Sequence, residues 1–405
     1  MEEFRHAEFS GLRNTVPNNR FGLDDLEAAV NVDVDDSKRV ALRHGRGALL
    51  LSGAYKSLWS DGAIALAVKS QTSLMRIFPD WSEAALRAGL MPGLDMSYAA
   101  NDSRVFYANG ADSGIIQDGA SRTWGLNIPT GQPEAEAIGG LLEAGRYQFA
   151  VTYLRADRQE SGTPPAAVID LTVDGGIRLT EIPVSADPGV TLKIVYFSKK
   201  NDETLYRAGV IPASATTFDY QVEASMQVSL MTQHLRPPPA GHYVDVFNGR
   251  TLVGHESTLY YSEPYSLELF DLRKNHQLNG RMTMLAALDG GVYVSTPTGI
   301  MWLDGLDPTK WVYRKLKDYG ALRGALYFCS RDMVLDGQGQ KTVAVFATSQ
   351  GVCVGEDGGV ITNLTQSRYL YPIQDRGALV VRRYRGFTQG LTVFQGTERA
   401  ASASS

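Results

Sequence analysis

The sequence has little of several things that would assign it to a functional class at once. Only two of its 405 residues are cysteines, Cys329 and Cys353, and both lie in apolar strand-like runs. We therefore expect buried thiols rather than a disulfide or a metal pair. No apolar run approaches the roughly 20 residues that cross a bilayer, and the start, MEEFRHAEFS, lacks the basic and apolar regions of a signal peptide. These absences predict a soluble protein made in a reducing cytoplasm, without membrane insertion.

The sequence also lacks a large excess of charge of one sign, since the formal net charge is only −5. Proteins that grip nucleic acid along a whole surface need a strong basic excess to release counterions. A protein past which DNA slides does not need that excess, because weak attraction then becomes an advantage. The charge balance therefore argues against a protein that grips nucleic acid along its whole surface, and it leaves open a protein past which DNA slides.

Motifs that carry chemistry are missing as well. The sequence contains no G-x-S-x-G elbow, P-loop or Rossmann fingerprint, and its six histidines show no i, i+4 metal spacing. The acidic run 31–36 has Asp36 and Leu42 where a calcium loop needs glycine and glutamate. Acids at the ends of apolar runs each precede a glycine and predict turns: Asp61, Asp118, Asp304 and Asp357. We expect no enzyme, no catalytic residue, no cofactor and no metal site.

What the sequence does have is a recurrent hairpin, in which two alternating apolar runs flank a tight turn. It occurs at 57–77, 103–119, 250–270, 290–305 and 342–361. Degenerate repetition of β-hairpins is typical of a β-propeller. Proline clusters at 128–133 and 236–242 interrupt the repetition, because such clusters stiffen a connection and end a central strand.

Between these breaks lie about seven strand-like runs at short spacing, from RYQFAVTYLR at 146 to MQVSLM at 231. That density indicates an immunoglobulin- or fibronectin-type sandwich. The roughly 260 residues outside the insert and the two ends, at about 42 residues a blade, predict about six blades. The fold class is therefore an all-β propeller with an inserted sandwich. The expected division is an arm with a short helix and first hairpin (1–45), blades (46–128), sandwich (129–238), blades (239–397) and a mobile tail (398–405).

The two ends of the chain carry the candidate interface residues. Helical spacing over 21–30 predicts a short helix, and 30–45 predicts a hairpin that shares a closing blade with strand 391–394. Two basic groups would meet if the ends meet, and they form a candidate patch facing a partner or DNA, or else ordinary solvated strand edges: Arg39, Arg43 and Arg46, with Arg382, Arg383 and Arg385. Four apolar residues are candidate anchors of the arm on a neighbour, or else pack locally: Phe4, Phe9, Leu12 and Phe21.

At two places the sequence is similar to virion proteins. RFGLDDLEAAVNVDVDDSKRVALRHGR (20–46) resembles the opening of tail proteins from short-tailed bacteriophages, where a comparable stretch leads into a propeller. AGRYQFAVTYLRADRQESGTPP (144–165) is similar to the start of fibronectin-like domains in phage virion proteins.

The resemblance implies a structural protein, a tail hub or nozzle subunit of a podovirus-like virion, and offers no catalytic residues. Such proteins form a homo-oligomeric ring, usually a hexamer, below the portal and adaptor. The ring contacts other tail proteins, lets genomic DNA pass without sequence specificity, and helps to retain and release the genome. The alternative is a glycan-binding or glycan-cleaving propeller, a fold in which paired carboxylates lie at one rim.

Overall fold

The computed structural model describes residues 8–30, 32–34, 38–42, 49–223, 228–335, 339–365, 368–370, 375–384 and 387–395. In these ranges the chain forms β-strands and short 3-10 turns, with no α-helix among the residues described. Pairing is antiparallel except between β1 and β2 and at one bridge between β28 and β32. The all-β class expected from the sequence is confirmed.

Five antiparallel meanders share one design, with four strands in chain order. Four of them are complete sheets, and the fifth is part of a six-stranded sheet. Alternation of side chains gives each strand two faces, and left-handed residues reverse the chain. Asn248 and Gly249, for example, join β20 to β21 with φ of 44° and 71°, the backbone of a type I′ hairpin turn. Tight reversals of this kind keep consecutive strands adjacent.

The first two meanders are β5 (Tyr55–Ser60), β6 (Ala65–Lys69), β7 (Ser73–Ile77) and β8 (Glu83–Arg87), then β9 (Ser97–Asn101), β10 (Arg104–Ala108), β11 (Ser113–Gln117) and β12 (Ala120–Arg122). The third and fourth are β20 (Tyr243–Phe247), β21 (Arg250–His255), β22 (Thr258–Glu263) and β23 (Ser266–Gln277), then β24 (Met284–Leu288), β25 (Gly291–Thr296), β26 (Gly299–Asp304) and β27 (Val312–Lys317). The fifth is β28 (Ala321–Ser330), β29 (Thr342–Thr348), β30 (Gly351–Glu356) and β31 (Val360–Asn363), and the turns are η2 (Pro308–Lys310) and η3 (Arg331–Met333).

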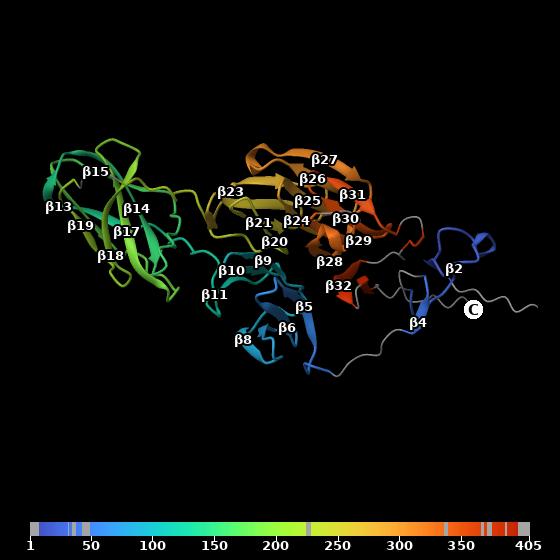
Figure 1. Ribbon diagram of the computed structural model, residues 1–405. Coiled ribbons are helices and arrows are strands. Elements are labelled where there is room, and N and C mark those ends of the chain that lie inside the picture. The colour runs from blue at the N-terminus through green and yellow to red at the C-terminus, as the bar shows by residue number, and fades with distance from the viewer. Residues whose placement is uncertain are drawn as a thin grey trace, which may run out of the picture.

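Successive meanders pack face to face through apolar layers. Between the second and third, the Trp124 ring lies 5.1 Å from Phe106 and 6.2 Å from Phe270, and all three are buried. The first strands β9, β20, β24 and β28 are neighbours in that order, as Figure 1 shows near the centre of the body. The meanders are thus arranged around their first strands as blades are around the axis of a propeller.

The two ends of the chain add short elements. Before the first meander come β1 (Gly11–Leu12), η1 (Asn18–Arg20), β2 (Asp25–Leu26), β3 (Val32–Val34) and β4 (Val40–Leu42), and after the fifth come β32 (Arg376–Tyr384) and β33 (Phe387–Gln395). β32 lies beside β28, and Leu379 and Val381 on it are buried against the fifth meander. The hairpin β3–β4 forms a sheet of its own, so the closing sheet that we expected it to share with 391–394 is absent from the described chain.

The prediction of a short helix over 21–30 is wrong. The Asp25 carboxylate accepts a hydrogen bond from the backbone of Gly22 at 2.9 Å, and β2 pairs in parallel with β1. Leu23 and Val30, which a helix would turn toward a partner, are 82% and 84% exposed. A short helix is stable mainly through burial of its apolar face, and here polar contacts fix a turn instead.

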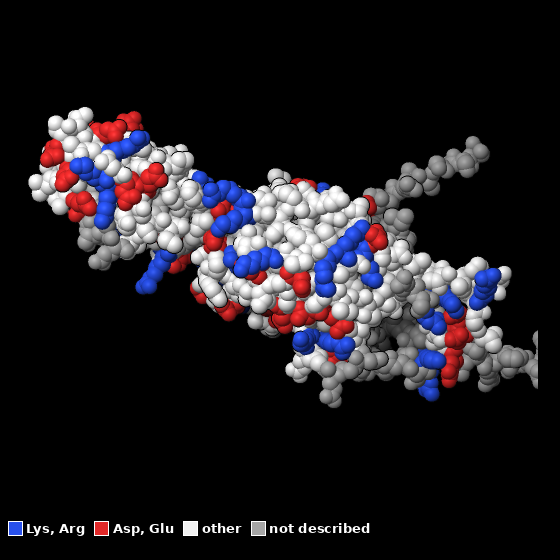
Figure 2. Space-filling view, turned by 90° about the horizontal axis from the view of Figure 1, so that it is seen from above, with Lys and Arg blue, Asp and Glu red and all other residues white. Residues whose placement is uncertain are grey.

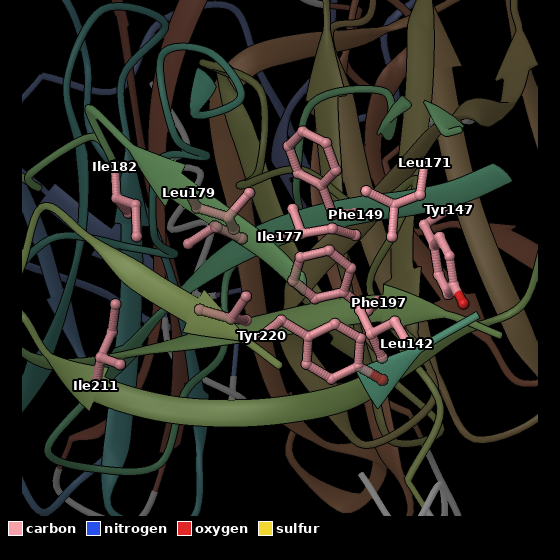
Figure 3. Packing of buried hydrophobic residues seen from close by; sticks show 12 residues of the cluster. Leu142, Tyr147, Phe149, Leu171, Ile177, Leu179, Ile182, Phe197, Ile211 and Tyr220 are labelled. Carbon is pink, nitrogen blue, oxygen red and sulfur yellow. The ribbon is translucent and has the colours of Figure 1, made fainter. Parts of the chain in front are cut away.

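The segment between the second and third meanders makes two sheets that pair with no other described strand. One contains β13 (Glu134–Leu142), β16 (Gly175–Thr180) and β19 (Phe218–Tyr220), and the other β15 (Ala167–Leu171), β14 (Gly145–Arg155), β17 (Val190–Ser198) and β18 (Leu205–Pro212). Their inner faces share one apolar core, in which the Phe197 ring stacks on Tyr220 at 4.3 Å and contacts Phe149 at 5.7 Å (Figure 3). This sandwich projects from one side of the body (Figure 1).

Candidate functional site

Side chains at the starts of four first strands and of β32 meet at one end of the body. Asp95 precedes β9, Tyr243 opens β20, Arg281 precedes β24, Arg323 lies near the start of β28, and Arg376 opens β32. Arg323 and Arg376 are partners in the β28–β32 bridge, and Asp95, Arg281 and Arg323 all act electrostatically on the Tyr243 hydroxyl. We call these five residues the axial cluster.

Polar contacts hold the axial cluster together. Arg323 donates a hydrogen bond to the Tyr243 oxygen, and burial raises the pKa of Tyr243, so this residue is a neutral hydroxyl at physiological pH. Arg376 Nη1 lies 3.4 Å from Asp95 Oδ2, and Arg281 Nε lies 3.1 Å from Glu256 Oε2. The cluster itself therefore brings three guanidinium groups together with one carboxylate.

Asp245 lies two residues after Tyr243 on β20, and so on the same face of that strand. Its carboxylate accepts hydrogen bonds from the backbone of Ala287 on β24 at 2.7 Å and of Val246 at 2.8 Å. Burial raises the pKa of Asp245 to about 7, although both backbone donors favour the ionised form. Asp245 thus joins two neighbouring first strands through a group that titrates near neutrality.

Two hollows lie near the other ends of the first strands. The first, of about 420 Å³, is lined by Ser330, Asp332, Met333, Gln340 and Arg383. The second, of about 350 Å³, is lined by Val246, Phe247, Asn248, Ala287, Leu288, Asp289 and Thr342. Each has one carboxylate in its lining.

Half of the basic residues singled out from the sequence belong to the described chain. Arg382 donates to Gln389 across the β32–β33 hairpin at 3.0 and 3.2 Å, and Arg383 pairs with Asp332 at 2.9 Å. Arg39 is exposed just before β4. Arg43, Arg46 and Arg385 lie outside the described residues, so a patch that unites all six stays a prediction. On the face in Figure 2, basic and acidic side chains are interspersed rather than separated.

The candidate anchors of the arm lie partly within local structure. Phe9, Leu12 and Phe21 are half-buried, whereas Phe4 falls outside the described residues. The Phe9 backbone donates to the Lys38 carbonyl at 2.6 Å, and Leu12 pairs with Leu26 across β1 and β2. Phe9 and Leu12 thus have backbone partners within the chain, whereas docking of Phe9, Leu12 and Phe21 on a neighbour stays a prediction.

The arm is fastened to residues near the other end of the sequence. Asn14 and Leu370 exchange two hydrogen bonds of 2.8 Å, and Arg368 pairs with Asp25 at 2.8 Å. Hydrogen bonds from Arg13 and from the Gly22 backbone, with the charge of Arg368, hold the pKa of Asp25 below its usual range. The arm therefore contacts residues 368–370 of the described chain, and not through a shared sheet.

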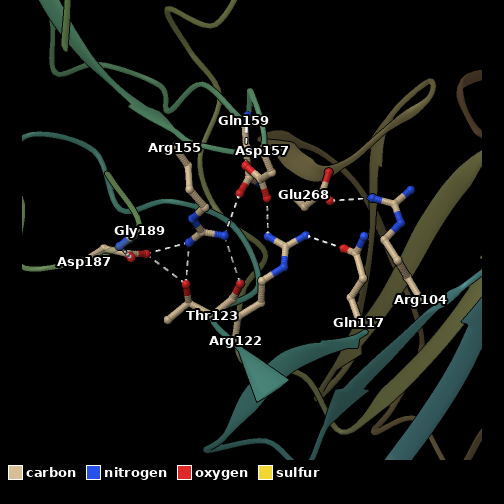
Figure 4. A network of polar contacts seen from close by, with 10 residues as sticks. All are labelled: Arg104, Gln117, Arg122, Thr123, Arg155, Asp157, Gln159, Asp187, Gly189 and Glu268. Atoms are coloured by element: carbon tan, nitrogen blue, oxygen red, sulfur yellow. Dashed lines mark hydrogen bonds and ion pairs between the residues drawn. The ribbon is translucent and has the colours of Figure 1, made fainter. Parts of the chain in front are cut away.

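A polar network joins the sandwich to the second meander (Figure 4). Arg155, whose side chain is 6% exposed, lies 2.5 Å from both Asp187 Oδ2 and Thr123 Oγ1. Burial alone would raise the pKa of Asp187, but the Gly189 backbone and Arg155 together lower it. Arg122 reaches Asp157 of the sandwich at 2.7 Å. These contacts fix the direction in which the sandwich projects.

Other candidate chemistry finds little support. Cys329 and Cys353 are free thiols on β28 and β30, and burial raises the pKa of Cys329 to about 11. Over the described ranges, no three His, Cys, Asp or Glu side chains gather to hold a metal ion. The same ranges contain no helix with the length and apolarity to cross a membrane.

Comparisons with known proteins leave the family open. No protein-family description and no curated protein matches the sequence. Among solved structures, BBS1N in complex with ARL6DN is 13% identical, with 85% of this chain and 90% of that chain covered and a TM-score of 0.35. Citrobacter koseri AztD is 11% identical (89% and 94% covered, TM-score 0.27), and the WD40 β-propeller domain of Doa1 is 10% identical (76% and 82% covered, TM-score 0.27). Scores this low carry no argument, so the arrangement described above rests on sheet order and packing.

Proposed function

We propose that this chain is a structural subunit of a bacteriophage tail, a hub or nozzle protein that forms a ring below the portal and adaptor. The ring would extend the DNA conduit, retain the packaged genome and release it. The motifs at 20–46 and 144–165 suggest this class. The observation that carries the proposal is that two surfaces of the single chain leave apolar side chains uncovered.

One uncovered surface is the N-terminal segment, where Leu23, Val30, Leu42 and Leu49 are each about 80% exposed. The other is the outer face of the β32–β33 hairpin, where Val393 is 68% exposed and Val380 is its neighbour on the same face. Exposed apolar side chains that gather into a patch mark an interaction surface, and the proposal takes each of these two groups as part of one. Contact between the first surface of one copy and the second surface of the next would be heterologous, and such contacts close into a ring when the rotation permits.

The proposal also includes the number of blades and the type of sandwich. We propose six blades, five formed by the meanders and the last by the β32–β33 hairpin. In a single chain this hairpin has two strands and bridges to β28 within one six-stranded sheet. The sandwich resembles an immunoglobulin-type domain in strand order. β15-β14-β17-β18 corresponds to C′-C-F-G, and β13-β16 to B-E, with β19 in the place of D. Such a domain needs no chemistry of its own, in keeping with a role in the virion scaffold.

The alternative, a glycan-cleaving propeller, gains no specific support. Hydrolysis of a glycosidic bond uses two carboxylates facing one substrate, whereas each of the two hollows is lined by one. The chain has a mildly acidic balance, which suits a conduit that does not hold the passing polyanion.

The proposal is tested by the double substitution Arg43→Ala with Arg46→Ala. We expect the purified monomer to keep its melting temperature while ring assembly, or retention of the genome in the particle, is impaired. The matched control is Arg146→Ala with Arg207→Ala, which removes two exposed arginines from the sandwich. Normal infectious yield of the first variant would refute a role for the basic group at 39–46. Turnover in a glycan-hydrolysis screen would favour the alternative.

A further inference from the structure

The axial cluster has more positive charge than its partners balance. Its three arginines lie at the starts of β24, β28 and β32, of which β28 and β32 belong to one sheet. They face Asp95 and the neighbouring Glu256. Arg376 and Asp95 are 3.4 Å apart at their nearest atoms, longer than the 2.7–2.9 Å of a tight charge-assisted hydrogen bond. Within the described chain, Arg323 forms no ion pair with a carboxylate, and its partner in the cluster is the neutral Tyr243 hydroxyl.

The cluster is also open to an incoming ion. The Arg281 side chain is 49% exposed and the Arg376 side chain 40% exposed, whereas Tyr243 is half-buried. Guanidinium groups offer planar pairs of N–H donors that match the oxygens of a phosphate group. Arg281 precedes β24, Arg323 lies on β28 and Arg376 lies on β32, which pairs with β28. Because these strands are packed together, their arrangement sets the spacing of the three arginines before any ligand arrives.

We propose that the axial cluster is a binding site for a small oxyanion with two negative charges, of the phosphate or phosphate-monoester class. Arg281, Arg323 and Arg376 would donate to its oxygens, and the Tyr243 hydroxyl, which accepts from Arg323, would donate its own proton to a further oxygen. Asp95 would give up part of its contact with Arg376. A phosphodiester in nucleic acid carries one charge per phosphate and would satisfy fewer of these donors. The site belongs to the single chain and does not depend on ring assembly.

Binding is measured by isothermal titration of inorganic phosphate into the full-length chain at constant ionic strength, with chloride as the reference anion. Loss of one charge-assisted donor pair predicts that Arg323→Gln weakens binding by about tenfold or more. The control Arg146→Gln, an exposed arginine on β14 of the sandwich, should bind like the parent. If Arg323→Gln does not fold by tryptophan fluorescence, the more exposed Arg281→Gln takes its place.

Saturable phosphate binding that is lost in Arg323→Gln or Arg281→Gln but kept in Arg146→Gln supports the proposal. Absence of saturable binding, or equal weakening in all variants, overturns it. A third arm uses a short single-stranded oligonucleotide at the same phosphate concentration. If the oligonucleotide binds more tightly than free phosphate and needs Arg323, the site recognises phosphodiesters and the proposal is wrong. None of these outcomes depends on whether the chain forms a tail ring.

Discussion

Replacing Asp245 by asparagine should remove a specific part of the pH dependence of folding. The pKa of this carboxyl rises from 3.8 to about 7 on folding, chiefly because burial disfavours its charge. Below the lower value the group is protonated in both states, and above the upper value it is ionised in both. Between them the folded state keeps a proton that the unfolded state has lost. Stability contributed by Asp245 is therefore present at low pH and lost as the pH rises toward 7.

The size of the effect follows from the shift. At about 1.4 kcal/mol per pKa unit, ionisation of Asp245 costs the folded state at most about 4 kcal/mol at pH 8. Asparagine keeps the size and one carbonyl acceptor but loses one of the two hydrogen bonds from Ala287 and Val246, at a cost of about 1 kcal/mol. We expect Asp245→Asn to be slightly less stable than the parent at pH 4 and more stable at pH 8.

The assay is urea unfolding of parent and variant at pH 4, 6 and 8, followed by tryptophan fluorescence. All five tryptophans lie outside the sandwich, so the signal reports the meanders: Trp59, Trp81, Trp124, Trp302 and Trp311. The control is Asp289→Asn, the same substitution at an exposed turn after β24. If the free energies of unfolding of Asp245→Asn and the parent differ by the same amount at pH 4, 6 and 8, the reasoning is refuted. In that case Asp245 would not be the group whose pKa rises on folding.

Two further substitutions test the sandwich. Arg155→Ala leaves the half-buried Asp187 carboxylate without its cation, which should cost about 3 kcal/mol or more and loosen the junction between sandwich and meanders. Small-angle scattering would detect a changed maximum dimension, and limited proteolysis would detect cleavage near 123–133. Unchanged results in both assays would count against a fixed junction. Lys193, fully buried with its ammonium donating only to the carbonyls of Ala215 and Ile182, has its pKa lowered by burial. The parent should therefore gain stability as the pH rises toward the pKa of a free lysine. By calorimetry, Lys193→Met should unfold at a higher temperature than the parent at pH 7, and this difference should shrink at pH 10. Equal unfolding temperatures at pH 7 would contradict this.

The local sequence pattern was sufficient to predict the strands in which apolar and polar residues alternate clearly. The five repeated hairpins correspond to strands of the five meanders, because alternation and turn residues are local signals. β13 was missed, since its EAEAIGGLL combines acids on the outer face with two glycines at a register shift. Of MQVSLM, the described residues 228–231 form no strand of their own and contribute an isolated bridge at Ser229. The prediction of a helix over 21–30 was wrong because the spacing of apolar residues does not reveal whether another part of the protein buries them.

The axial cluster could not be predicted from the sequence. Its members lie as many as 281 positions apart, from Asp95 to Arg376. The sandwich accounts for much of this distance, since it lies between Asp95 and Tyr243. Each is an ordinary charged or aromatic residue at the start of a strand, with no motif around it. Only the order of the sheets around their first strands brings the five together. Contacts made by the arm with Leu370 are of the same kind, since they join residues 356 positions apart.

The central claim is that copies of this chain join through their ends into a ring within a phage tail. Cryo-electron microscopy of an intact particle tests it most directly. We expect density for this chain in a closed ring around the DNA conduit, below the portal, with the N-terminal segment of one copy covering the β32–β33 hairpin of the next. Single, separate copies with both surfaces exposed, or density for this chain outside the tail, would contradict the account.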